Sequence, residues 1–330
     1  MWQLAVDEPA PFELLSPRSI DEAVDLSARH GFDSALMAGG TDLLDQLKQH
    51  RRTPRFVINP KTIRDLRKLT VSGERVSIGA LTTIGDLERH VELNRLCPAL
   101  TKAASRVATP QIRNVGTIGG NLLQDSRCPY YRGPWYCYRA GGIQCDARHG
   151  VNQEHAIFGG NRCYTVSPSD TAPALIALGA TATIHGPAPR QVSLEDLFMP
   201  PAENITSMHR VTHGQILSEV TVPIRAGVRS TFIKYAMRNS WDFAIASVAV
   251  ALRLDSGLAR DARIVIGGVA PIPWRSQDAE REIDGKRLDR TTIEAAARAA
   301  IAGARPLAQN EYKIAIVKKL VRTALMELAQ

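Results

Sequence analysis

The chain has 330 residues, 44% of them hydrophobic and 22% charged, which suffices for a large core in two or three domains. Its longest apolar runs, such as 243–252, are too short to cross a bilayer, and its first fifteen residues lack the basic start of a secretory signal. The formal net charge is +8, but no lysine and arginine run interleaved with aromatic residues points to nucleic acid. We therefore expect no membrane span and no nucleic-acid partner, and a cytoplasmic location unless a signal-bearing partner exports the chain to the periplasm.

The first sixty residues predict a small unit of alternating strands and helices. Ser19, with Glu22 three residues later, has the pattern of a capping box that opens a helix, and Gly31 is placed to end it. Alternation of short strands and helices is typical of an α/β unit. The other elements expected here are strands at 35–37 and 56–58 and, after the turn at 38–42, a helix to about residue 49.

A second unit is expected from about residue 61. Thr83, with Asp86 three residues later, predicts a capped helix that runs to about residue 91. The glycine-rich and cysteine-rich segments discussed below fall within this unit. Its other predicted elements are helices at 98–107 and 170–178 and strands at 76–78, 182–185 and 218–222.

The composition changes near residue 231, where strand-like segments are followed by helices. Thr292 is expected to cap a helix over 293–302, and a final helix over 311–328 carries one apolar stripe. Sheet first and helices after indicate a separate α+β domain. The predicted strands are 231–237, 244–254 and 262–268.

Two glycine-rich turns have the composition of backbones that approach phosphates. Gly39 and Gly40 lie between a strand and a helix, where glycine lets N–H groups come close and the helix N-terminus favours an anion. A second turn covers 116–121, and neither is a full GxGxxG, so neither is a Rossmann fingerprint. Two turns that converge on one diphosphate are one interpretation, and tight turns without a ligand are the other.

Four of the five cysteines fall in one loop, as Cys128, Cys137, Cys145 and Cys163. Their spacing, C-x8-C-x7-C-x17-C, contains none of the CxxC pairs that structural zinc usually uses. Four thiolates from a loop rich in glycine and proline suit a 4Fe–4S cluster, and four unrelated free thiols are the alternative. Cys97 lies apart in an apolar stretch and is interpreted as a small buried hydrophobe.

Two histidines lie in the same loop, His149 and His155, and either has the chemistry to ligate a metal. Because four cysteines already supply a complete ligand set, we interpret both histidines as surface residues or as neighbours of the ligands. A hypothesis of a different class is a zinc-stabilised nucleotide-binding scaffold with no redox role.

Five segments, in this order, resemble the FAD-binding medium subunit of the xanthine dehydrogenase/molybdenum hydroxylase family. The resemblance extends from near residue 1 to near residue 328. Each motif is weak alone, but five in the same order are specific. They are AGGTDLL at 38–44, RNVGTIGGNL at 113–122, SPSDTAPALIALGA at 167–180, ILSEVTVP at 216–223 and IKYAMRNSWDFAIASVAVAL at 233–252.

This resemblance implies an α+β fold with three parts. A FAD-binding domain of the PCMH type would contain two α/β subdomains, at 1–60 and 61–225, with an iron–sulfur loop at 124–165. A C-terminal domain of the CO dehydrogenase flavoprotein type, sheet followed by helices, would cover 226–330.

The cysteine loop resembles the loop found in two branches of this family. QDSRCPYY at 124–131, followed by three more cysteines, is similar to periplasmic-type bacterial aldehyde oxidoreductases and to 4-hydroxybenzoyl-CoA reductases, whose medium subunits hold an extra 4Fe–4S cluster. Three segments are more similar to the aldehyde branch, and the reductase branch has a shorter last gap. They are QEHAIFG at 153–159, GGVAPIPWR at 267–275 and AQNEYKI at 308–314.

Matching motif positions imply which residues would bind FAD. Lys234 matches a lysine near the isoalloxazine edge and Asp170 an aspartate near the flavin; without the family they would be a solvated strand residue and a helix N-cap. Ile216 and Leu217 match a pair that packs near the adenine or the ring. The two pyrophosphate turns would comprise Ala38, Gly39, Gly40, Thr41 and Asp42, and Thr117, Gly119, Gly120 and Asn121.

The implied function is electron transfer, with no catalytic residue for the organic substrate in this chain. A large molybdopterin-binding subunit would oxidise an aldehyde, and electrons would pass through a small subunit with two 2Fe–2S clusters to FAD held here. An external acceptor would then reoxidise this heterotrimer. In the 4-hydroxybenzoyl-CoA reductase type, which is the alternative, electrons flow toward the substrate.

Overall fold

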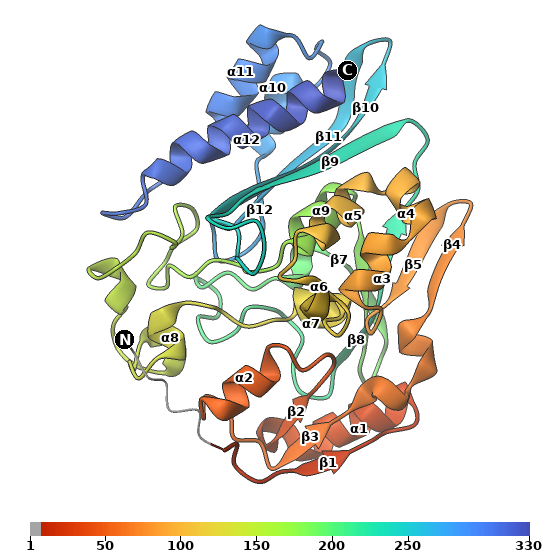
Figure 1. Cartoon of the computed structure of the whole chain (residues 1–330), viewed down its shortest axis with the longest axis vertical. Coiled ribbons are helices and arrows are strands. Elements are labelled where there is room, and N and C mark those ends of the chain that lie inside the picture. Colours follow the sequence, from red (N-terminus) through yellow and green to blue (C-terminus); the bar gives the residue numbers. More distant parts are fainter. Residues whose placement is uncertain (1–7) are drawn as a thin grey trace.

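In the computed structural model, which describes residues 8–330, the chain folds around three sheets with helices on their faces (Figure 1). The prediction that the chain starts without a secretory signal concerns its first fifteen residues, of which 1–7 lie outside the described residues. Within 8–330 no helix combines the length and the apolar character that a bilayer crossing needs.

The first sheet is parallel and has the strand order β1-β3-β2. Helix α1 begins where the sequence predicts, because the Ser19 hydroxyl accepts a hydrogen bond from the Glu22 N–H. The Glu22 carboxylate bonds to the N–H of Arg18 instead of Ser19, and Gly31 ends the helix with φ 47°. The elements are β1 (Glu13–Leu15), α1 (Ile20–His30), β2 (Ser34–Leu36), α2 (Leu43–Lys48) and β3 (Phe56–Ile58).

The second sheet has five strands in the order β4-β5-β8-β6-β7, and all of its pairings are antiparallel. This differs from the parallel arrangement that an α/β subdomain suggests, because β8 inserts between two hairpins that come from distant parts of the chain. The strands are β4 (Leu69–Ser72), β5 (Arg75–Gly79), β6 (Thr181–His185), β7 (Arg190–Ser193) and β8 (Ile216–Pro223).

Several helices of the second unit share one hydrophobic core with this sheet and the C-terminal sheet. The capping box of Thr83 and Asp86 is confirmed in both directions, but the helix breaks at His90 and a new one follows. The helices are α3 (Ile84–Arg89), α4 (Val91–Leu96), α5 (Pro98–Ser105), α6 (Pro110–Arg113), α7 (Ile118–Leu122), α8 (Pro129–Arg132) and α9 (Thr171–Ala177).

The third sheet is antiparallel, with the order β12-β11-β10-β9, and α10, α11 and α12 cover one of its faces (Figure 1). This confirms the prediction of a sheet followed by helices. The predicted cap Thr292 is wrong: the Asp289 carboxylate caps α11 and accepts from the N–H of Thr292 at 2.8 Å. The elements are β9 (Val228–Tyr235), β10 (Ala246–Asp255), β11 (Leu258–Gly267), β12 (Trp274–Arg275), α10 (Gln277–Ile283), α11 (Arg290–Ala299) and α12 (Tyr312–Ala329).

Strand β10 is buried on both faces, which explains its continuous apolar sequence. Ala249 and Ala251 face a core shared with α5 and α9, whereas Val248 and Val250 face α10, α11 and α12. The C-terminal sheet is therefore held between the flavin-domain helices and its own helices.

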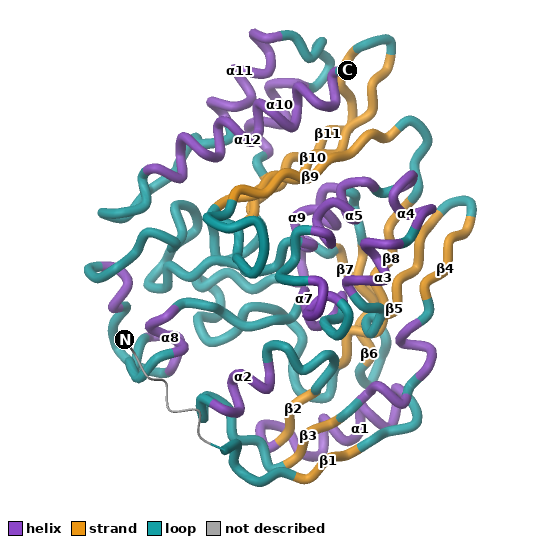
Figure 2. The backbone as a smooth tube through the Cα atoms, in the orientation of Figure 1, coloured by secondary structure: helices purple, strands orange, loops and turns teal. Residues whose placement is uncertain are grey.

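The cysteine-bearing segment 124–165 is mostly irregular backbone (Figure 2). It contains α8 and two 3-10 turns, Tyr138–Ala140 and Asp146–Arg148. Gly142 shows how tightly the loop turns, because a Cβ on this residue would lie 1.8 Å from the carbonyl oxygen of Tyr136.

Candidate functional site

The two predicted glycine turns lie directly against each other. A Cβ on Gly39 would stand 2.2 Å from the carbonyl oxygen of Val115, just before the second turn. A Cβ on Gly120 would lie 3.9 Å from the Cβ of Ala38 in the first turn. Residues 76 and 82 positions apart in sequence thus form one backbone surface, as expected if both turns serve one ligand.

Replacing Gly39 with alanine is expected to force the turns apart, because a backbone carbonyl cannot yield as a flexible side chain does. Overpacking of this kind costs about 1–3 kcal/mol in the free energy of unfolding. We expect a lower Tm and a lower flavin content in the purified protein. Gly73→Ala is the matched control, since a Cβ there meets nothing within 4 Å. Wild-type Tm and flavin content in Gly39→Ala would contradict the prediction.

The second turn donates its N–H groups within the protein. Thr117 caps α7 by accepting the N–H of Gly120 at 3.1 Å, and the N–H of Gly119 bonds to the carbonyl of Ala80 at 2.8 Å. Asn121 accepts the hydroxyls of Ser169 and Thr171, both at 2.7 Å. The turn is therefore tied to the start of α9, on either side of Asp170.

Asp170 and Lys234 form a buried ion pair of 2.6 Å, with side chains that are 6% and 2% exposed. The Lys234 ammonium also donates to the carbonyls of Arg106 and Asp242, at 2.9 and 2.8 Å. Lys234 is thus not a solvated strand residue, and the Asp170 carboxylate makes no N-cap hydrogen bond. Burial raises the pKa of Asp170, and the charge of Lys234 opposes that rise.

Ile216 and Leu217 are both buried, on opposite faces of β8. Ile216 belongs to the cluster of α1 and the first sheet, against which Ala38 packs, and Leu217 belongs to the central core. Of this predicted pair, only Ile216 therefore lies beside the first glycine turn.

A cavity of about 310 Å³ connects Asp170 with the cysteine loop. Cys128 and His155 also line it, together with residues 165–169. Arg127 also lines it, and its guanidinium lies over the ring of Phe243, 5.2 Å from the ring centroid, which is a cation–π contact. The lining of the cavity thus combines arginine side chains, several carboxylates and the ring of Phe243.

The four clustered cysteines are free thiols, with Cys137 and Cys163 buried and Cys128 and Cys145 half-buried. Burial raises the pKa of Cys128 to about 12, and the charges of Cys163 and Cys137 add to that rise. Burial likewise raises the pKa of Cys145 and Cys163, and the charge of Cys137 raises each of these two pKa values further. The thiols therefore lie within electrostatic range of one another. Over residues 8–330, no three Cys, His, Asp or Glu side chains are grouped closely enough to hold a single metal ion.

The two loop histidines differ in position. His149 is exposed, whereas His155 is 5% exposed and its Nε2 lies 3.3 Å from the Sγ of Cys128. Burial lowers the pKa of His155 to about 4, so a neutral imidazole contacts the thiol. Cys97 is 1% exposed, which agrees with the interpretation as a small buried hydrophobe.

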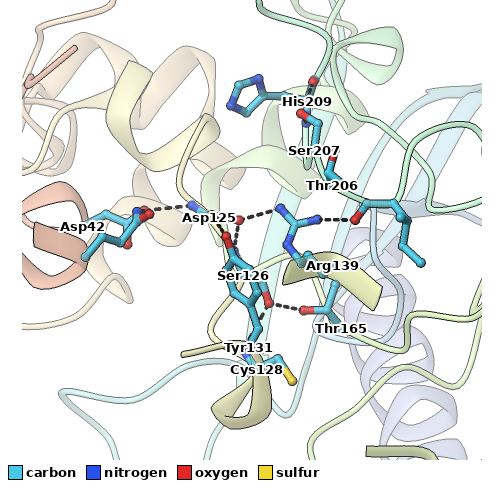
Figure 3. A network of polar contacts seen from close by, with 12 residues as sticks. Asp42, Asp125, Ser126, Cys128, Tyr131, Arg139, Thr165, Thr206, Ser207 and His209 are labelled. Atoms are coloured by element: carbon cyan, nitrogen blue, oxygen red, sulfur yellow. Dashed lines mark hydrogen bonds and ion pairs between the residues drawn. The ribbon is translucent and has the colours of Figure 1, made fainter. Parts of the chain in front are cut away.

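A polar network that the sequence analysis did not single out supports the loop (Figure 3). Asp125 accepts hydrogen bonds from the Tyr131 hydroxyl at 2.8 Å, from Arg139 at 2.5 Å and from the N–H of Ser126 at 2.7 Å. Burial alone would raise the pKa of Asp125, but Arg139 and these hydrogen bonds lower it. The sequence offered two signals for this network: Asp125 lies three residues before Cys128, and Arg139 lies two residues after Cys137.

The segment between Cys145 and Cys163 is held by residues just before and at the start of α12. Asn152 and Gln309 exchange hydrogen bonds, each side-chain oxygen accepting the partner's N–H, at 3.2 and 3.0 Å. Asn310, which is fully buried, donates to the carbonyl of His155 at 3.0 Å. The C-terminal domain therefore positions the histidine that contacts Cys128.

Lys313 is fully buried and donates to the carbonyls of Glu154 and Gly268, both at 2.8 Å. Burial lowers the pKa of Lys313 to about 7, against a smaller opposing effect of Glu154. Above this pH the unfolded chain binds one proton more than the folded chain, up to the ordinary lysine pKa near 10.4. The free energy of unfolding should therefore rise with pH across that window, by at most about 1.4 kcal/mol per pH unit from this group.

Lys313→Met is expected to remove this contribution and flatten the pH dependence between pH 7.5 and 9.5. Urea unfolding at several pH values measures the slope. Lys319→Met, on the exposed side of the same helix, is the control and should keep the wild-type slope. Parallel pH dependences of the wild type and Lys313→Met would show that the ammonium is not the source.

The fold and the paired glycine turns agree with two known domain families. Residues 10–225 match the FAD binding domain in molybdopterin dehydrogenase, and residues 231–328 match the CO dehydrogenase flavoprotein C-terminal domain. The chain therefore belongs to the FAD-binding medium subunits of the xanthine dehydrogenase/CO dehydrogenase family, which confirms the family and the fold class indicated by the five motifs.

Individual relatives align over nearly the whole chain. The aldehyde oxidoreductase FAD-binding subunit PaoB of Escherichia coli (strain K12) is 33% identical over 92% of this chain and 93% of its own. The carbon monoxide dehydrogenase medium chain of Hydrogenophaga pseudoflava is 30% identical over 96% of each. A solved structure of the Hydrogenophaga enzyme lacking the Mo-pyranopterin moiety gives a TM-score of 0.77 at 29% identity, over 97% of both chains. Quinoline 2-oxidoreductase from Pseudomonas putida 86, at 23% identity and a TM-score of 0.76 over 98% of both chains, shares the fold.

Proposed function

We propose that this chain is the electron-transfer subunit of a molybdenum-containing aldehyde oxidoreductase, and that it carries FAD and one 4Fe–4S cluster. The main support is the cavity that both Asp170 and Cys128 line, since it joins the residues proposed to lie near the flavin to the cysteine loop. The similarity to an aldehyde oxidoreductase FAD-binding subunit supports the choice of aldehydes.

The residues present fit FAD. The first turn, Ala38 to Asp42, would approach the diphosphate, and the second, Thr117 to Asn121, would shape the site by its lack of side chains at Gly119 and Gly120. The isoalloxazine would enter the cavity beside the Asp170–Lys234 pair. FAD supplies one- and two-electron chemistry, while this chain binds and orients it.

The donor set of the loop suits an iron–sulfur cluster. Cys128, Cys137, Cys145 and Cys163 belong to one loop, and neighbouring cysteines of this set raise the pKa of Cys128, Cys145 and Cys163 beyond the effect of burial. Four cysteine thiolates are the ligands that a 4Fe–4S cluster uses. Because burial disfavours the bare thiolates, binding of iron would have to displace their protons.

The remaining parts of the proposal concern organisation. The three sheets support a division into subdomains at 1–60 and 61–225, with the loop at 124–165, and a domain at 226–330. The partners would be a large molybdopterin-binding subunit and a small subunit with two 2Fe–2S clusters, in a heterotrimer. The complex would work in the cytoplasm, or in the periplasm if a partner carries the export signal.

Anaerobic co-purification of the chain with its partner subunits tests the proposal. We expect a yellow-brown complex with one flavin and about eight irons, four of them in this chain, that oxidises aldehydes. A colourless chain that contains zinc would support the nucleotide-binding scaffold instead. Reduction of 4-hydroxybenzoyl-CoA by the reduced complex would support the reductase type.

A further inference from the structure

Asp42 lies at the end of the first glycine turn, but its carboxylate is directed at the cysteine loop (Figure 3). One oxygen accepts from Arg132 at 2.7 Å and from Arg127 at 3.0 Å. The other accepts from the N–H of Asp125 at 2.8 Å and from Gln46 at 3.1 Å. The side chain is 17% exposed, and both of its oxygens are occupied by donors of this chain.

These donors lead directly to the first cysteine. Arg132 donates through its Nε to the carbonyl of Ser126 at 2.7 Å, and Ser126 is fully buried. The Ser126 hydroxyl accepts the N–H of Cys128 at 3.1 Å and also bonds to the hydroxyl of Thr165 at 2.5 Å. Asp42 is thus joined to the loop both before Cys128 and, through Thr165, just after Cys163.

This arrangement changes the role expected for Asp42. A free carboxylate beside a diphosphate would repel it, whereas here two guanidinium groups offset the charge of Asp42. The same carboxylate is the acceptor for a backbone N–H of the cysteine loop, which fixes the direction in which the loop leaves α7.

We propose that Asp42 is a positioning residue that couples the first glycine turn to the cysteine loop, so that occupation of either site stabilises the other. The identity of the two cofactors rests on the proposed function, but the coupling rests on the contacts of Asp42. By linkage, the effect of iron on flavin binding must equal the effect of flavin on iron binding.

The test compares Asp42→Asn with Asp45→Asn in the purified complex. Asp42→Asn keeps the size of the side chain and removes its charge; Asp45 lies one turn further along α2, is 55% exposed and is 3.9 Å from Arg127. For Asp42→Asn we expect a several-fold loss of the iron of this chain and several-fold faster reaction of the loop thiols with a thiol reagent after iron removal. Asp45→Asn should match the wild type in both.

Two further measurements separate positioning from general instability. Because Asp42 and Arg132 act as one unit, Arg132→Gln combined with Asp42→Asn should lose no more iron than either single variant. In the wild-type complex, removal of the iron of this chain should speed FAD release several-fold. This measurement does not depend on the folding of any variant. Additive losses, or FAD release that is independent of iron, would overturn the inference.

The outcomes also separate this inference from the proposed function. A wild-type complex without flavin or iron would refute the proposed function itself. A wild-type complex with both cofactors, together with an Asp42→Asn variant of unchanged iron content and thiol reactivity, would refute only the coupling.

Discussion

Replacing Cys137 with serine is expected to remove about four irons from each chain, together with the broad absorption of the cluster. Cys137 is 7% exposed, and a negative charge on it raises the pKa of Cys128, Cys145 and Cys163, the other three proposed ligands. A serine hydroxyl loses its proton far less readily than a thiol, and its oxygen is a harder ligand than sulfur. Serine is therefore a poor replacement for a soft thiolate ligand. Iron and acid-labile sulfide analysis of the purified complex measures the loss.

The matched control is Cys97→Ser, which removes a buried thiol that lies outside the cysteine loop, in the central core. Its iron content should equal that of the wild type. Flavin should remain in Cys137→Ser, because the glycine turns do not depend on Cys137 for their shape, but the contacts of Asp42 predict faster flavin release. Full iron content in Cys137→Ser would remove Cys137 from the ligand set.

Local signals in the sequence predicted local structure well. The helix that follows Ser19 and ends at Gly31, and the capping box of Thr83 and Asp86, depend on residues within one turn of each other. The α11 cap was misplaced because Asp289 and Thr292 both suit an N-cap. Strands β1, β4 and β7 were not predicted: they are short and largely exposed, whereas β2 and β3, which are as short as β1, are mostly buried and were predicted.

The site was predictable where composition alone carried the signal. The clustering of cysteines and the two glycine turns were visible in the sequence, and the structure shows the turns in contact. The antiparallel second sheet and the contact of His155 with Cys128 were not visible, because both depend on pairing between residues far apart in the chain. The same holds for the carboxylate of Asp42, whose partners in the cysteine loop lie more than 80 residues away.

Lys234→Met is expected to cause the largest loss of stability. It leaves the Asp170 carboxylate buried without its counter-ion, and the carbonyls of Arg106 and Asp242 without their donor. Removal of one partner of a buried ion pair costs about 3–5 kcal/mol in the free energy of unfolding. Urea unfolding measures this loss, and flavin content should fall with it because Asp170 lines the cavity.

The pH dependence identifies the buried carboxylate as the cause. Without Lys234, burial raises the pKa of Asp170 with less opposition, so the folded variant binds a proton more readily than the unfolded chain does. The stabilisation that the protonated Asp170 gives the folded variant is present at low pH and is lost as pH rises through the raised pKa. The difference in the free energy of unfolding between the wild type and Lys234→Met should therefore be larger at pH 8 than at pH 5. Adding Asp170→Asn to Lys234→Met removes the unpaired charge and should recover part of the stability while abolishing this extra pH dependence. A deficit that is independent of pH, and that the second substitution does not reduce, would assign the loss to packing around the aliphatic stem of Lys234 instead.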